Sequence, residues 1–118
     1  MLGKKKNDKN QFDSSTTVIS SGITFNGDIT GNGSLKVDGT IKGNLDIKGD
    51  ILISDNGKID GDIKSDNVTL SGTVNGNITA SDILLISETG KLIGDSYSNT
   101  LVIDEQGVFE GEAVICDR

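Results

Sequence analysis

Short runs in which apolar and polar residues alternate recur along the chain, separated by turns that contain glycine. The clearest are Leu-x-Val at 35–37, Ile-x-Ile at 51–53, Val-x-Leu at 68–70 and Leu-x-Ile at 101–103. Such alternation is typical of a β-strand that buries one face, and no segment has the periodicity of an amphipathic helix. The pattern therefore predicts an all-β protein made of very short strands.

A five-residue unit, apolar-x-Gly-Asp/Asn-apolar, repeats along the same stretch. Four clear copies occupy residues 25–29, 41–45, 59–63 and 74–78, and two looser copies occupy 92–96 and 109–113. The spacing of the copies indicates a repeat of about 17 residues. Glycines that follow Asn or Asp indicate turns with positive φ. These glycines are Gly27, Gly33, Gly39, Gly57, Gly61 and Gly76.

One repeat alone cannot bury its aliphatic side chains, but stacked repeats place equivalent positions above one another at roughly 4.8 Å. The sequence therefore predicts a right-handed parallel β-helix, a β-solenoid of about six turns with a roughly triangular cross-section. A left-handed hexapeptide helix fits poorly, because the apolar steps are irregular. A β-sandwich of hairpins is the alternative fold, since the same turns suit it.

The chain divides into a basic N-terminal tail over residues 1–16, a β-helix domain over 17–115 and a short end at 116–118. Charge follows this division: residues 1–13 have a net charge of +2 and residues 14–118 have −9, which together give the −7 of the chain. Because an acidic body repels phosphate groups, we expect no nucleic-acid partner.

The composition argues against catalysis. The chain has no histidine, which removes the commonest general base together with Ser-His-Asp and Cys-His arrangements. We therefore expect neither an enzyme nor a metal or cofactor site. The single cysteine, Cys116, provides no disulfide framework, and no apolar run has the length of a signal peptide or a membrane span. These features favour a cytoplasmic protein.

The first apolar position of the repeated unit predicts an inward column with an aromatic residue at each end. Its inner members are Ile41, Ile59, Val74 and Leu92, and its ends are Phe25 and Phe109. In the simpler interpretation all six side chains belong to the core. In the alternative, Phe25 and Phe109 cover the terminal turns and contact the next subunit, so that Phe109→Arg would abolish assembly.

A second column follows from the residue after each repeated glycine. Its members are Asp28, Asn44, Asp62, Asn77, Asp95 and Glu112. In the structural interpretation these side chains bond their own backbone at the corners, as Asx residues do in turns. A cation-binding ladder and an acid/base pair of carboxylates are the two functional alternatives.

Neither end of the predicted solenoid has a recognisable capping helix, and solenoids need polar caps to remain soluble as monomers. An open sheet edge presents unpaired N–H and C=O groups that pair readily with another chain. We therefore expect end-to-end self-association into a filament.

The N-terminal tail combines two apolar side chains, Met1 and Leu2, with three consecutive cations, Lys4, Lys5 and Lys6. This combination is typical of a weak anchor to an anionic membrane surface, which many copies in a filament would strengthen. The alternative is a solvated start with no binding role.

Three repeats resemble the bactofilin family: residues 39–45 (GTIKGNL), 57–63 (GKIDGDI) and 72–78 (GTVNGNI). The resemblance covers residues 17 to 115, with departures from the family pattern at Ile23 and Ser96. It implies a β-helix that polymerises without nucleotide into non-polar bacterial cytoskeletal filaments at the inner face of the cytoplasmic membrane. The family's C-terminal aromatic residue, important for assembly, would correspond to Phe109.

The resemblance further implies a membrane-associated scaffold for cell shape, cell-wall growth or motility, working near peptidoglycan-modifying enzymes or other bactofilins. The family's membrane-targeting start would correspond to Met1, Leu2 and Lys4 to Lys6. Two hypotheses from other classes stay open. One is a carbohydrate- or cation-binding β-helix without polymerisation, and the other is a secreted repeat protein.

Overall fold

The structure is a computed structural model that describes residues 16–115, and these residues form thirteen strands and no helix. Accordingly, this part of the chain has no helix that could span a membrane. The strands are β1 (Thr16–Ile19), β2 (Thr24–Asn26), β3 (Ile29–Val37), β4 (Thr40–Lys42), β5 (Leu45–Ile53), β6 (Lys58–Asp60), β7 (Ile63–Leu70), β8 (Thr73–Asn75), β9 (Ile78–Ile86), β10 (Lys91–Ile93), β11 (Ser96–Ile103), β12 (Val108–Glu110) and β13 (Ala113–Ile115).

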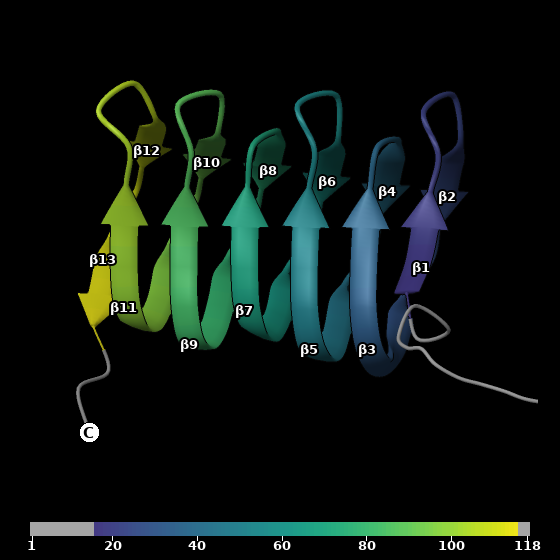
Figure 1. The fold of residues 1–118 in the computed structure, drawn as a ribbon, viewed down its shortest axis with the longest axis horizontal. Coiled ribbons are helices and arrows are strands. Elements are labelled where there is room, and N and C mark those ends of the chain that lie inside the picture. Colours follow the sequence, from purple (N-terminus) through teal and green to yellow (C-terminus); the bar gives the residue numbers. More distant parts are fainter. Residues whose placement is uncertain (1–15, 116–118) are drawn as a thin grey trace, which may run out of the picture.

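The strands wind into a single β-solenoid (Figure 1). One sheet has the order β1-β3-β5-β7-β9-β11-β13, the other has the order β12-β10-β8-β6-β4-β2, and every described pairing is parallel. The chain rises at the front of Figure 1, crosses over and descends at the back as it advances from β1 to β13. The predicted right-handed parallel β-helix is thereby confirmed, and a sandwich of antiparallel hairpins is excluded.

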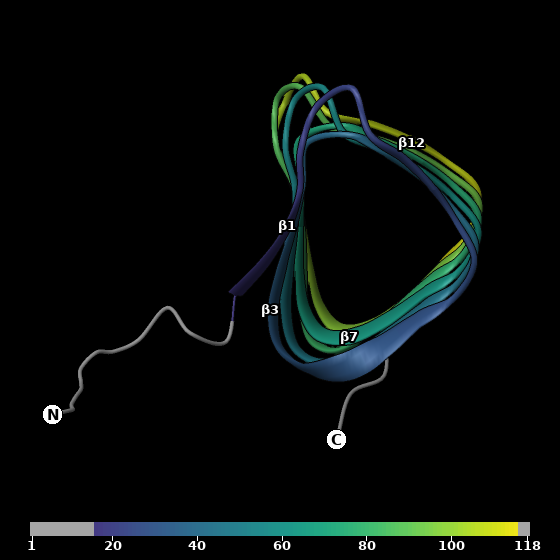
Figure 2. The same cartoon turned by 90° about the vertical axis from the view of Figure 1, so that its right-hand side faces the viewer.

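The cross-section has three sides because each long strand bends in its middle (Figure 2). The first part of each long strand forms face A (45–47 in β5), the second part forms face B (50–53), and the short strands form face C (58–60). A register shift between Ile47 and Asp50 of β5 marks the bend. Faces C and A meet at one corner, called here the ladder corner. Faces B and C meet at another, the loop corner.

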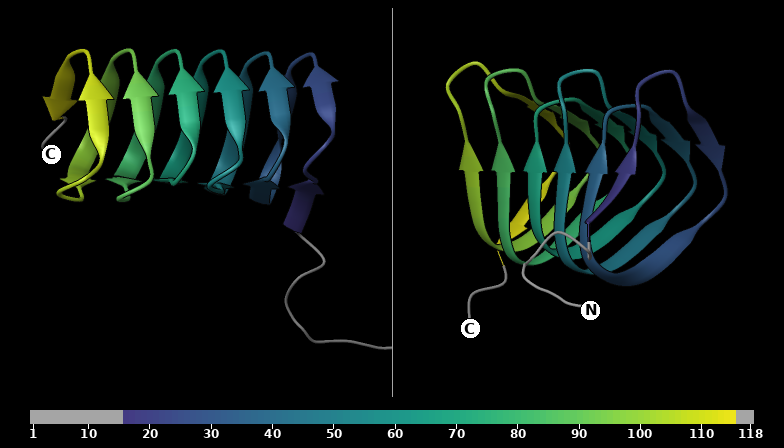
Figure 3. Two further views of the ribbon diagram at one scale, coloured as in Figure 1. Left: turned by 90° about the horizontal axis from the view of Figure 1, so that it is seen from above. Right: turned by 45° about the vertical axis from the view of Figure 1, so that its right-hand side comes forward.

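Two loop lengths at the loop corner account for most of the uneven repeat, and the rest arises because β7 and β11 are each one residue shorter than β3, β5 and β9. The loops at 20–23, 54–57, 87–90 and 104–107 have four residues, whereas those at 38–39 and 71–72 have two. The long loops project beyond the short ones along one edge (Figure 3). Thr89 Oγ1 donates to Asp55 Oδ1 at 3.2 Å and Ser87 Oγ donates to Ser71 Oγ at 2.9 Å, so the loop at 87–90 reaches across two turns. Length variation is thus confined to this corner and to the bends of the long strands, where the register shifts by one residue.

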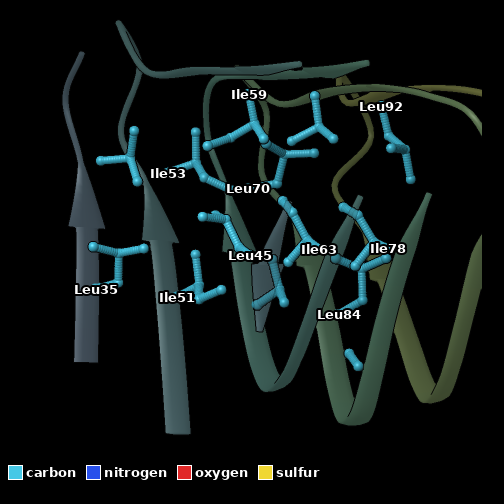
Figure 4. Close-up of a cluster of buried hydrophobic side chains, with 14 of the residues drawn as sticks. Leu35, Leu45, Ile51, Ile53, Ile59, Ile63, Leu70, Ile78, Leu84 and Leu92 are labelled. Carbon is cyan, nitrogen blue, oxygen red and sulfur yellow. The ribbon is translucent and has the colours of Figure 1, made fainter. Parts of the chain in front are cut away.

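The core is a stack of aliphatic side chains that all three faces supply (Figure 4). It extends from Leu35 to Leu92, and its members are at most 6% exposed. Towards the C-terminal end face A changes character, because the small polar side chains of Ser96 and Ser98 take inward positions. Both hydroxyls are buried without a hydrogen-bond partner. The core is therefore best packed in the central turns and weaker in the last ones.

Candidate functional site at the ends of the β-helix

Both ends of the described solenoid are open sheet edges. In the seven-stranded sheet β1 and β13 each have one neighbour, and in the six-stranded sheet the same holds for β2 and β12. The outer backbone groups of these strands have no ladder partner within residues 16–115, and such edges readily pair with another chain. Each end of the rod therefore offers backbone groups that can pair with a strand of another chain.

Apolar side chains accompany the open edges. At the N-terminal end Ile23 is 51% exposed and Phe25 36%, and at the C-terminal end Ile103 is 41% exposed and Ile115 51%. Inward positions such as Ile103 and Ile115 would be buried by one further turn, as their equivalents in the middle of the rod are. The ends thus expose a cross-section of the core.

The structure places Phe25 and Phe109 at opposite ends of one column, as the spacing predicts. The register aligns Phe25 with Ile41, then Ile59, Val74, Leu92 and finally Phe109. The four inner members are fully buried, Phe25 is 36% exposed, and Phe109 is half-buried against the core. The two aromatic residues are therefore not equivalent, and Phe109 is the better-packed end.

The ladder corner is built from hydrogen bonds between turns. The amide of Asn44 donates to Asp28 Oδ1 at 2.9 Å, and four further amides, up to that of Glu112, donate in the same way at 3.0–3.1 Å. The expectation that each side chain bonds its own backbone is wrong, because the corner turns the amide of the next coil directly onto the side-chain oxygen. The column is therefore a continuous series of hydrogen bonds, each of which connects one turn to the next.

The hydrogen bonds also bear on the functional alternatives for this column. The five residues from Asp28 to Asp95 each use one side-chain oxygen for the neighbouring turn. Within the residues that the structure describes, no group of three or more Asp, Glu or Cys side chains is arranged to hold a metal ion. The arrangement that is present therefore serves the stacking of turns.

Glycine is needed at the ladder corner for two physical reasons. From Gly27 to Gly111 the repeated glycines have φ between 137° and 155°, a region that side chains disfavour. From Gly43 onwards, a Cβ atom would also collide with the carbonyl oxygen of the glycine one turn earlier. Gly39 and Gly57 differ from expectation, since they lack positive φ and are required by close backbone contacts alone.

Several exposed aliphatic side chains do not follow from the alternating pattern. Leu52, Ile83 and Val102 point outward from face B with 37%, 45% and 46% of their surface exposed. The signal in the sequence is an unbroken apolar run, as at 51–53 and 101–103, where the middle residue must point away from the core. The proposed membrane-targeting residues Met1, Leu2, Lys4, Lys5 and Lys6 lie outside the described residues, as does Cys116.

Comparison with known proteins identifies the same architecture. A family model described as "Bactofilin: Polymer-forming cytoskeletal" matches residues 17–114. The Thermus thermophilus bactofilin, reconstructed by cryo-EM as double helical filaments, has a TM-score of 0.77 at 22% identity over 84% of this chain and 98% of its own. The cytoskeletal bactofilin BacA, determined by solid-state NMR, has a TM-score of 0.78 at 25% identity over 89% of this chain and 100% of its own. The curated proteins contain no match.

Proposed function

The chain belongs to the bactofilin family of polymer-forming cytoskeletal proteins, and from this premise we propose that it assembles end to end into filaments without nucleotide. The observation that carries the proposal is that, within residues 16–115, both ends of the six-turn parallel β-helix are open sheet edges with exposed apolar side chains. The T. thermophilus relative, described as forming filaments, supports it by its shared fold.

A second subunit stacked on either end would form the same two kinds of interaction that hold neighbouring turns together, backbone pairing and apolar burial. The unpaired backbone groups of the terminal strands would join a new ladder, and side chains such as Ile103 and Ile115 would leave water. Burial of apolar surface contributes about 25 cal/mol per Å², so an exposed core cross-section is a substantial driving force. Assembly driven by burial and backbone pairing requires no nucleotide, and the role we propose is structural and not enzymatic.

Membrane attachment is the second part of the proposal. Residues 16–115 carry six basic and fifteen acidic groups, so this body is repelled by anionic lipids. Binding to the inner face of the cytoplasmic membrane would depend on Met1, Leu2 and Lys4 to Lys6, with each lysine contributing about 1 kcal/mol. One tail would bind weakly, and a filament would bind through many tails at once. Such a filament would act as a scaffold in cell shape, cell-wall growth or motility.

Electron microscopy and sedimentation of the purified protein, with and without nucleotide, test the assembly. Filaments should form under both conditions, and Phe109→Arg should prevent them because it places a cation in the apolar end. The matched control is Tyr97→Arg, since Tyr97 is an aromatic residue that is 40% exposed on the side of the rod. Filaments of folded Phe109→Arg protein, or a strictly monomeric wild type at high concentration, would contradict the proposal.

Flotation with anionic liposomes tests the attachment. We expect filaments of the full chain to float, and filaments lacking residues 1–9 to remain in the dense fraction. Equal flotation of the two proteins would remove the tail from the proposal and leave the assembly untouched.

A further inference from the structure

Face A carries a polar groove on its outer surface. Two adjoining hollows of about 440 Å³ and 400 Å³ lie over this face, and both are lined by Asp46, Lys64 and Thr79. One hollow continues to the ladder corner and includes Tyr97, and the other continues towards the bend and includes Asp66. Each volume lies within the range of ligand sites, roughly 300–1,000 Å³.

The strand register explains why the face is hollowed. It places Lys64, Thr79 and Tyr97 one above another on β7, β9 and β11, so a short threonine lies between two long side chains. The strands that carry Lys64 and Tyr97 are roughly 10 Å apart, which is twice the ladder spacing. Tyr97 is 40% exposed. The groove therefore has a small polar floor, with an ammonium group on one side and an aromatic ring on the other.

The charges along the groove nearly cancel. Lys48 and Lys64 balance Asp46 and Asp66, and within residues 16–115 neither lysine forms an ion pair with either carboxylate. The further carboxylate, that of Asp62 at the ladder corner, already accepts the amide of the next turn at 3.0 Å. A groove of this kind selects neither a free anion nor a free cation, and it complements a ligand without net charge.

Backbone pairing is not available in the groove. The strands β5, β7, β9 and β11 each have a neighbour on both sides, so their backbone groups belong to the ladders of the sheet. An extended peptide is recognised mainly by free backbone groups at a sheet edge. A ligand of face A must therefore bond to side chains, and it must be rich in polar groups of its own.

The side chains of the groove offer donors and acceptors close together. Carboxylates accept, ammonium groups donate, and the hydroxyl groups of Thr79 and Ser81 do both. Asp66 is already oriented, because Ser81 Oγ donates to its Oδ1 at 2.7 Å and leaves the second oxygen for a ligand. A sugar hydroxyl also donates and accepts, and a pyranose ring presents a C–H face that packs on an aromatic ring. A neutral saccharide matches both properties.

We infer that face A binds a neutral oligosaccharide in this groove. One sugar ring would lie over Thr79 with its C–H face against Tyr97, and its hydroxyls would bond to Asp46 and Lys64. The next sugar would lie towards the bend, within reach of Asp66. The site is on the side of the rod, so it goes beyond end-to-end assembly and does not depend on it. A filament would repeat the groove in every subunit and bind a long saccharide through many sites at once.

Equilibrium dialysis of the full chain against cellotetraose, maltotetraose and chitotetraose tests the inference. We expect at least one of the three to bind with a Kd of about 1 mM or lower. Tyr97→Ala and Lys64→Ala should each weaken that binding at least tenfold, and Tyr97→Phe should retain it because the ring remains. The matched control is Lys91→Ala, which removes an exposed lysine from face C and should bind as the wild type does. Circular dichroism would show that all four variants fold.

Three outcomes would overturn the inference. They are a wild type that binds none of the three saccharides, equal binding by the wild type and both Tyr97→Ala and Lys64→Ala, and binding that is lost equally in Lys91→Ala. Inorganic phosphate serves as a further probe, and saccharide binding that it abolishes would mean that the lysines form an anion site instead.

The same proteins separate this inference from the proposed function. Tyr97→Ala should still form filaments, and Phe109→Arg should still bind the saccharide although it does not assemble. Wild-type protein that binds saccharide without forming filaments would overturn the proposed assembly alone. Filaments without saccharide binding would overturn the groove on face A alone.

Discussion

The central turns and the end turns of this β-helix carry the same repeat but differ in how they bury it. Ile59 lies between Ile41 and Val74 in its column and is fully buried, whereas Phe25 occupies the first place in that column and is 36% exposed. The difference comes from neighbours, because a central turn is covered on both sides and an end turn on one. Stability therefore resides in the middle of the rod, and the capacity for association resides at its ends.

The largest expected loss of stability concerns the inward column that contains both Phe25 and Ile59. Ile59→Ala should lower the free energy of unfolding by about 2–5 kcal/mol, because it leaves a cavity between two covered turns. Phe25→Ala should cost distinctly less, since its ring is still partly in contact with water. Urea denaturation measures both, in a Phe109→Arg background that removes assembly from the comparison. Equal losses at the two positions would mean that the ends are as well packed as the middle.

The glycines of the ladder corner provide a second comparison between central and end turns, and the expected change in stability is intermediate in size. Gly76 has φ of 148° and lies against the carbonyl of Gly61, whereas Gly27 has φ of 137° and no earlier turn beneath it. Gly76→Ala should therefore destabilise the fold by about 2–4 kcal/mol through backbone strain and overpacking together. Gly27→Ala should cost about 1–2 kcal/mol through strain alone. Thermal melts of the two variants measure both losses of stability. Equal losses would show that contact with an earlier turn does not add to the cost of the substitution.

The smallest effect tests the weaker core near the C-terminal end. Ser96 is buried with no hydrogen-bond partner, whereas the hydroxyl of Ser65 donates to the carbonyl of Gly49 at 2.8 Å. Removing an unsatisfied hydroxyl should be favourable, so Ser96→Ala should stabilise the protein by about 1 kcal/mol. Ser65→Ala should destabilise it by about the same amount, since the Gly49 carbonyl loses its donor. A loss of stability in Ser96→Ala would show that its hydroxyl does find a partner.

Particular residues show how far sequence reasoning reached at the candidate site. The column from Phe25 to Phe109 and the corner column from Asp28 to Glu112 follow from the spacing alone, because stacked turns align equivalent positions. The hydrogen-bond partners at the corner did not follow. They depend on where the amide of the next turn lies, which a pattern within one repeat does not contain.

The sequence by itself determined the architecture of this protein. A repeat of about 17 residues, with apolar residues at inward positions and glycine at the turns, favours stacked turns, and the parallel strand pairing then excluded the alternative sandwich of hairpins. The same pattern predicted that the terminal turns would have open edges, and within residues 16–115 each terminal strand has one neighbour in its sheet.

Only the tertiary structure decided what the surfaces of the rod would be. Loops of two and four residues, together with one-residue differences at the bends of the long strands, absorb the uneven repeat. In one of the long loops Thr89 reaches Asp55 across an intervening turn. Gly39 and Gly57 are required by close backbone contacts, and Leu52, Leu85 and Val102 lie in one outward column only because the register aligns their strands. The physical reason is that contacts between turns join residues 15 to 34 positions apart, and their geometry exists only once the turns are stacked.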